Sequence, residues 1–142
     1  MTWGTVLDQY KYMHAQGLFP GYSMERHVDA IARLVKDSGA KTLLDYGCGK
    51  GLQYLEKDLH YAWGGMLPSL YDPGVPAFAE KPSGRFDGVI CTDVLEHIPE
   101  GDLPYLIDDV ISYADKWVFF SICTRKAKKT LPDGRNCHLT VK

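Results

Sequence analysis

The sequence predicts a three-layer α/β fold, in which helices cover both faces of a mostly parallel sheet. Two observations support this class. Short apolar runs without polar alternation, as in strands buried on both faces, alternate with stretches whose apolar residues recur at helical spacing. In addition, three glycines follow the first apolar run in "LLDYGCGKG", residues Leu43 to Gly51. In open α/β sheets, ligands bind just beyond the carboxyl ends of the strands, so this loop is the first candidate site.

Composition indicates one folded domain, residues 1–142, with 45% hydrophobic residues and a formal charge of -2. So small a net charge gives no overall field for nucleic acid or an anionic membrane, and we expect neither as a partner. The chain has no apolar stretch of about eighteen residues and no signal-peptide pattern at its start, so we expect a cytoplasmic protein. The four cysteines form no C-x-x-C pair, and we interpret them as reduced thiols.

The first helix and strand are defined by apolar spacing and by a glycine. Apolar residues recur at helical spacing from a possible N-cap, Ser23, to Gly39, which suits a C-terminal cap. The run from Lys41 to Asp45 then predicts the first central strand. After the glycine loop we expect a helix with Leu52, Leu55 and Leu59 on one side, which ends near Trp63, followed by a second strand at 68–72.

The second half of the chain continues the alternation. "FDGVIC", residues 86–91, predicts a third strand, a helix follows from about Asp102, and "KWVFFSIC", residues 116–123, predicts a fourth strand. Between Asp72 and Phe86, prolines leave room for at most one helical turn and a missing or vestigial edge strand. The apolar alternation at 136–142 is compatible with an edge strand that folds back, and an exposed sheet edge predicts a homodimer.

Spacing separates three possible functions for the glycine loop. A phosphate-binding P-loop fails, because Lys50 is followed by Gly51 and the four-residue spacer is absent. The dinucleotide fingerprint needs a small residue where this chain has Leu52, so a nicotinamide-linked dehydrogenase is disfavoured but stays open. The third pattern is Asp45-x-Gly47-x-Gly49-x-Gly51, which resembles motif I of class I S-adenosylmethionine-dependent methyltransferases.

Two further stretches strengthen this resemblance, which spans residues 41–123. "LYDP" places Asp72 about twenty residues after the loop, where an acid can bind both hydroxyls of a ribose. "FDGVICTDVLEHIP" resembles the fourth strand of the family and the segment after it. The resemblance implies a Rossmann-like three-layer sandwich, here with a shortened third-strand region and no full C-terminal hairpin.

The resemblance also implies a cofactor, S-adenosylmethionine, and its product S-adenosylhomocysteine. The methionine part would lie against the glycine loop, and the ribose would lie against Asp72. Taken singly, each glycine could instead serve a tight turn, and Asp72 an Asp-Pro-Gly turn. The cofactor-binding residues predicted in this way are Asp45, Gly47, Cys48, Gly49, Gly51, Asp72, Pro73 and Asp93.

Methyl transfer is an in-line displacement, so positioning of the acceptor dominates, and a base is needed only when the acceptor carries a proton. The catalytic candidates are Asp93 and His97, after the third strand, and His138 near the end of the chain. Asp93, Glu96 and His97 could also supply metal ligands, but hard cations prefer more carboxylates, so we expect no metal.

The resemblance predicts an enzyme that methylates a small-molecule, sugar-like or protein-borne acceptor. The alternative is a non-catalytic S-adenosylmethionine-binding scaffold or regulatory subunit. We divide the domain into an N-terminal cap segment, 1–22, an α/β core, 23–123, and a C-terminal extension, 124–142. The cap segment could cover the cofactor with its aromatic and imidazole side chains, or it could simply seal one face of the sheet. These side chains are Tyr10, Tyr12, His14, Phe19 and Tyr22.

Overall fold

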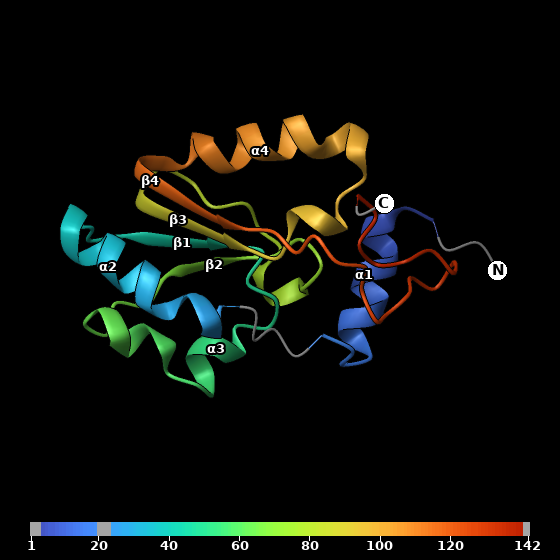
Figure 1. Ribbon diagram of the computed structural model, residues 1–142, viewed down its shortest axis with the longest axis horizontal. Helices are drawn as coiled ribbons and strands as arrows, with labels where there is room; N and C mark the ends of the chain where they lie inside the picture. The colour runs from blue at the N-terminus through green and yellow to red at the C-terminus, as the bar shows by residue number, and fades with distance from the viewer. Residues whose placement is uncertain (1–3, 20–23, 141–142) are drawn as a thin grey trace.

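A four-stranded parallel sheet lies between two helical layers in the computed structural model, which describes residues 4–19 and 24–140 (Figure 1). The strand order is β2-β1-β3-β4, and every neighbouring pair is parallel. The predicted α/β class is therefore confirmed. The strands are β1 (Leu43–Tyr46), β2 (Ser69–Tyr71), β3 (Phe86–Thr92) and β4 (Ala114–Ser121).

Apolar residues on both faces explain why the central strands show no polar alternation. In β1, Leu43 belongs to the core on the α2 side, whereas its neighbour Leu44 belongs to the core on the α4 side. In β3, Ile90 and Val89 divide between the two cores in the same way. All four side chains are almost fully buried. The sheet thus has a hydrophobic core on each side, as expected for parallel strands.

Helix α2 (Val28–Ser38) covers one face of the sheet, and α4 (Leu103–Ser112) covers the other (Figure 1). Gly39 ends α2 in the left-handed conformation at φ 66°, as its predicted capping role requires. The expected N-cap, Ser23, lies outside the described residues. A 3-10 turn, Glu25–His27, leads directly into α2.

The single helix expected from Leu52 to about Trp63 is wrong, because the segment is divided into two short pieces. Helix α3 (Leu52–Leu55) has only one turn, and a separate 3-10 turn, Leu59–Trp63, follows it. Asp58 lies between them with φ 52°, a left-handed conformation that interrupts helical hydrogen bonding. Trp63 of the second turn nevertheless reaches the core on the α2 side.

The shortened region after β2 is confirmed, since residues 72–85 contain one 3-10 turn, Pro76–Phe78, and no strand. The edge strand expected at 136–142 is wrong for its described part, 136–140, which holds only an isolated bridge between Asn136 and Thr130. The physical reason is that Cys137 is fully buried against Met13 and Leu131 instead of pairing with the sheet.

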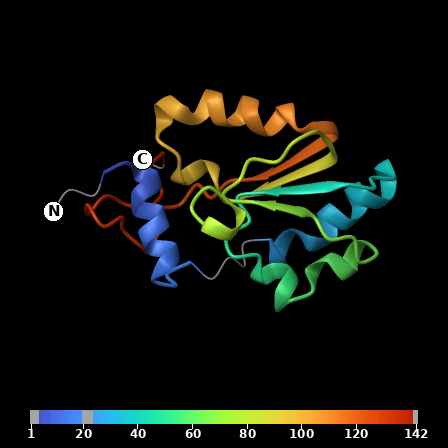
Figure 2. The same ribbon diagram turned by 180° about the vertical axis from the view of Figure 1, so that it is seen from behind.

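The N-terminal segment contains a helix that the sequence analysis did not predict, α1 (Val6–Ala15). Thr5 and Asp8 start it with a reciprocal capping box. Helix α1 lies beyond the carboxyl ends of the strands, side by side with the C-terminal segment (Figures 1 and 2). We call α1 together with residues 124–140 the cap. No helix among the residues described is long and apolar enough to span a bilayer.

Candidate functional site

The glycine loop after β1 depends on left-handed backbone. Gly47, Gly49 and Gly51 have φ values of 89°, 59° and 72°. A Cβ atom on Gly47 would lie 2.3 Å from Cγ2 of Val94, so even alanine would collide there. The N–H groups of Gly47 and Cys48 both donate to the carbonyl of Tyr71, at 2.7 and 3.1 Å. These bonds fix the loop against the end of β2.

Asp72 joins the glycine loop to the turn after β2. Its Oδ2 accepts the N–H of Gly49 at 2.8 Å, and its Oδ1 accepts the N–H of Gly74 at 2.8 Å. A carboxylate offers about four acceptor positions, so each oxygen keeps a lone pair for a further donor. Asp72 is therefore both a structural link and a carboxylate that can accept hydrogen bonds at the cavity wall.

A cavity of about 680 Å³ opens at the carboxyl ends of the strands, between the glycine loop, the segment after β3 and the cap. Its size fits a small organic molecule. The predicted site residues that line it are Gly47, Cys48, Gly49, Asp72, Pro73, Asp93, His97 and His138. Lining residues that the sequence analysis did not single out as site residues include Arg26, Tyr46, Gln53, Gly74 and Thr92.

Asp45 and Gly51 were also expected to touch the cofactor, but they are not among the residues that line this cavity. Asp45 is completely buried and accepts the Tyr54 hydroxyl at 2.6 Å through Oδ2. Burial raises the pKa of Asp45 to about 7, although the Tyr54 hydrogen bond opposes this shift. Gly51 begins α3 and packs near Leu70. Asp45 thus contacts α3 behind the loop, and Gly51 lies where the loop ends and α3 begins.

Asp93 follows β3 in a left-handed conformation, at φ 54°. Its Oδ1 accepts the hydroxyl of Ser121 at 3.0 Å, and its Oδ2 lies 3.1 Å from the guanidinium of Arg26. The Asp93 N–H also donates to the Ser121 carbonyl, at 2.9 Å. These contacts hold the carboxylate at the cavity wall. Arg26 could not be predicted as a site residue, since one arginine before a helix carries no sequence signal of this contact.

His97 lies between the core and the cap. Its Nδ1 is 2.7 Å from the Tyr10 hydroxyl and 3.0 Å from the carbonyl of Cys137. The Tyr10 hydroxyl also donates to the same carbonyl, at 2.8 Å. Burial lowers the pKa of His97 to about 4, and the nearby His138 acts in the same direction. His97 is therefore neutral at pH 7.

His138 approaches His97 from the C-terminal segment, with ring centroids 4.8 Å apart. Glu96 lies beside them, fully buried, and accepts the N–H of Cys123 at 2.7 Å through Oε2. One ligand atom from each of Glu96, His97 and His138 lies within 4.8 Å of the other two. Asp93, considered with Glu96 and His97 from the sequence, is not part of this group.

The N-terminal segment contributes side chains to the cavity wall, which favours the interpretation of this segment as a cover over the site. Tyr10, His14 and Phe19 line it, and the His14 ring lies against Gly74. Tyr12 is largely exposed and does not line the cavity, and Tyr22 lies outside the described residues. The basic run 125–129 is mostly exposed, as a solvated loop should be, and it forms one rim of the cavity.

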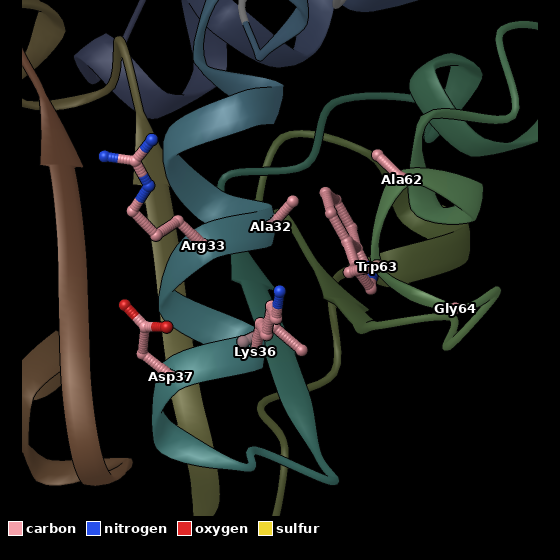
Figure 3. A pocket seen from close by; sticks show the side chains of 8 residues that line it. Ala32, Arg33, Lys36, Asp37, Ala62, Trp63 and Gly64 are labelled. Carbon is pink, nitrogen blue, oxygen red and sulfur yellow. The ribbon is translucent and has the colours of Figure 1, made fainter.

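A second hollow of about 490 Å³ lies on the helical layer between α2 and the turn at Leu59–Trp63. Trp63 faces Ala32 across it, and Arg33 and Asp37, which also line it, extend from the other side of α2 in Figure 3. It contains none of the predicted site residues and lies away from the carboxyl ends of the strands. The cavity under the cap is therefore the candidate site.

Comparison with known protein families and sequences gives a consistent result. Residues 19–136 match a family described as methyltransferase domain. Ubiquinone biosynthesis O-methyltransferase of Paraburkholderia xenovorans is 30% identical over 127 residues, which cover 73% of this chain and 52% of that protein. The protein of the same name from Chromobacterium violaceum is 30% identical over 128 residues, covering 73% and 53%. The chain thus spans about half the length of these curated relatives.

Among solved structures, the DhpI-SAM-HEP complex superimposes with a TM-score of 0.56 and 18% sequence identity, covering 96% of this chain and 81% of that one. The DhpI-SAH complex gives a TM-score of 0.55 at 19% identity, covering 96% and 79%. At this level of identity the likeness concerns the fold alone.

Proposed function

The chain belongs to the class I methyltransferase-domain family, and on that premise we propose that it binds S-adenosylmethionine in the cavity under the cap and transfers the methyl group to an oxygen of a small molecule. The bound cofactor would supply an activated methyl group on a sulfonium. The residues of the chain hold and align the two reactants, which is where most catalysis of such a displacement arises.

One observation carries the cofactor assignment: the Gly49 N–H to Asp72 Oδ2 bond of 2.8 Å, on the wall of the cavity. It brings the motif I loop and the ribose-binding acid together at one point. The unused lone pairs of Asp72, beside the exposed backbone of the glycine loop, fit a ligand with an adenosyl ribose. The dehydrogenase alternative loses support, because the chain matches a methyltransferase family.

We assign roles around the cavity from position. The backbone of Gly47, Cys48 and Gly49 would lie along the methionine part, with the ribose at Asp72 and Pro73. Asp45 would act only indirectly, by supporting the loop. Asp93 would face the junction of cofactor and acceptor, where Arg26 and Ser121 fix its carboxylate.

His97 and His138 would lie at the acceptor end. With a pKa near 4, His97 is a weak proton acceptor at pH 7, so we propose a positioning role for it instead of general-base catalysis. The names of the relatives favour a hydroxyl acceptor. A sugar-like acceptor, a cytoplasmic location and a homodimer through the free edge of β4 are further proposals that we carry over from the sequence.

The test is methyl transfer from S-adenosylmethionine carrying a labelled methyl group to a panel of phenols, hydroxy acids and sugars, with S-adenosylhomocysteine formation as the readout. We expect one acceptor class to be labelled, and an Asp72→Asn variant to lose activity through a raised KM for the cofactor. Asp37→Asn on the exposed face of α2 is the matched control.

Binding of the cofactor without transfer to any acceptor would favour the scaffold alternative. Failure to bind the cofactor, together with binding of a nicotinamide dinucleotide, would contradict the proposed function.

A further inference from the structure

Only one of the two carboxylate oxygens of Glu96 has a hydrogen-bond partner among the residues that the structure describes. The side chain is fully buried, and Oε2 accepts the N–H of Cys123, but Oε1 has no hydrogen-bond partner within the described part of the chain. A buried carboxylate oxygen without a partner costs free energy unless a cation or a donor compensates it. Glu96 also lines the cavity, so a ligand in the cavity can reach it.

The imidazoles of His97 and His138, next to Glu96, each point Nδ1 at a backbone carbonyl. Nδ1 of His97 contacts the carbonyl of Cys137, and Nδ1 of His138 contacts the carbonyl of Arg125. Nδ1 of His97 also lies 2.7 Å from the Tyr10 hydroxyl, but that hydroxyl donates its proton to the Cys137 carbonyl. Because a carbonyl oxygen can only accept a hydrogen bond, we assign the ligand form of both rings a proton on Nδ1. The lone pair of each Nε2 then remains available. Backbone carbonyls that fix a tautomer through the second ring nitrogen are the usual outer partners of metal-bound histidines.

We propose that Glu96, His97 and His138 form a binding site for a divalent transition-metal ion such as Zn²⁺, Co²⁺ or Mn²⁺. Two imidazoles and one carboxylate match the ligand preference of these ions, and not that of Mg²⁺ or Ca²⁺. The sequence predicts no metal, because the three ligands considered there, Asp93, Glu96 and His97, include too few carboxylates for a hard cation. In the structure the third member of the group is His138 and not Asp93, so the ligands are two imidazoles and one carboxylate.

The spacing of the ligand atoms is close to what an ion needs. Ligands bound at about 2.1 Å in a tetrahedral site lie about 3.4 Å from one another, and the three atoms here lie within 4.8 Å. The widest gap would have to close by about 1.4 Å. The side chain of His138 is the one that can move, because it is only partly buried, whereas Glu96 is fully buried.

Three protein ligands leave at least one coordination position open, and the site lies on the cavity wall. An oxygen of a bound ligand would occupy that position. This part of the proposal rests on the proposed function, because it assigns the metal to the acceptor end of the methyltransferase cavity. Metal binding itself does not require methyl transfer.

The experiment is a Co²⁺ titration of the whole chain after treatment with a chelator, without S-adenosylmethionine, followed by visible absorption. We expect one ion per chain. The paramagnetic proton NMR spectrum should show two strongly shifted exchangeable signals from the Nδ1–H groups. Glu96→Gln and His138→Gln should each weaken binding about tenfold or more, since loss of even an outer-shell partner costs 10 to 100-fold.

His27→Gln is the matched control, because His27 packs against Phe119 outside the group and should leave Co²⁺ affinity unchanged. Circular dichroism checks that each variant is folded. Should Glu96→Gln not fold, His138→Gln decides the result.

Absence of stoichiometric binding, or binding that neither folded variant weakens, would overturn the site. Calorimetry with S-adenosylhomocysteine is run in parallel, so failure of the metal site and failure of the cofactor site are seen separately.

Discussion

The hydroxyl of Tyr10 lies 2.7 Å from Nδ1 of His97, and both groups contact the carbonyl of Cys137. Helix α1, the segment after β3 and the C-terminal segment therefore meet at one point over the cavity. Met13, Leu131 and Cys137 form a buried cluster beside it. The cap is thus a packed part of the fold, and it determines the shape of this end of the cavity.

Replacing Leu131 with alanine should loosen the cap. Leu131 is 1% exposed, and Leu→Ala changes at such positions cost about 2 to 5 kcal/mol. Because the cluster lies in the cap, we expect hydrogen exchange to accelerate in α1 while the amides of β1 and β3 stay protected. Equal acceleration in both regions would contradict the view that the cap can open separately.

Gly47→Ala tests the geometry of the glycine loop. The new Cβ meets Val94 and the residue must keep φ 89°, so we expect a loss of about 1 to 3 kcal/mol in unfolding free energy. The double variant Gly47→Ala, Val94→Ala removes the collision but not the strain. Gly47→Ala should therefore cost less unfolding free energy in the Val94→Ala background than in the wild type, but still some. Urea unfolding of the double variant and of Val94→Ala alone measures this cost. Full recovery would show that φ strain is negligible.

Gly88→Ala tests the packing of the sheet far from the cavity. A Cβ there would lie 2.4 Å from the Trp117 ring, which cannot move freely because its Nε1 donates to Ser38 Oγ at 2.9 Å. Overpacking of this kind costs about 1 to 3 kcal/mol. We expect a lower thermal midpoint with unchanged affinity for S-adenosylhomocysteine. An unchanged midpoint would mean that β4 adjusts without strain.

Asp45→Asn should change how stability depends on pH. The pKa of Asp45 is raised to about 7 in the folded state from 3.8, so the folded protein holds this proton more tightly than the unfolded chain. The wild-type contribution is therefore present at low pH and lost as pH rises from about 4 to 7, by at most roughly 1.4 kcal/mol per unit. Asparagine stays neutral and still accepts the Tyr54 hydroxyl.

The variant should gain stability relative to the wild type between pH 5 and pH 7.5, as measured by urea unfolding at each pH. A difference that does not change with pH would show that Asp45 has an ordinary pKa in the folded protein. Comparing the two proteins is necessary because His97, with a lowered pKa, has the opposite effect on stability over part of this range.

Local patterns predicted much of the core. The sequence alone reveals properties of short segments: buried strands without polar alternation, the left-handed glycine that ends α2 at Gly39, and the spacing of the loop glycines. Asp72, which the motif predicts as a cofactor-binding residue, lies on the cavity wall. Helix α1 was missed although Thr5 and Asp8 carry a capping-box pattern, because the aromatic-rich segment was interpreted only as a cover.

The remaining parts depend on contacts between distant segments. Gln9 donates to Asp133, 124 residues away, and this pairing helps to dock α1 on the C-terminal segment. The alternation at Cys137 and Leu139 resembled an edge strand, yet these side chains pack into the cap. The same docking brings His138 to Glu96, which no spacing in the sequence could indicate. Asp45 was placed in the site by the motif, whereas it lies behind the loop.

The most direct test of the account is a calorimetric titration of the chain with S-adenosylhomocysteine, beside Asp72→Ala and the surface control Asp37→Ala. We predict that the wild type and the control bind alike and that Asp72→Ala weakens binding by about 1.5 to 3 kcal/mol, the value of hydrogen bonds to a charged group. No binding by the wild type, or equal binding by Asp72→Ala, would contradict a cofactor site formed by the glycine loop and Asp72.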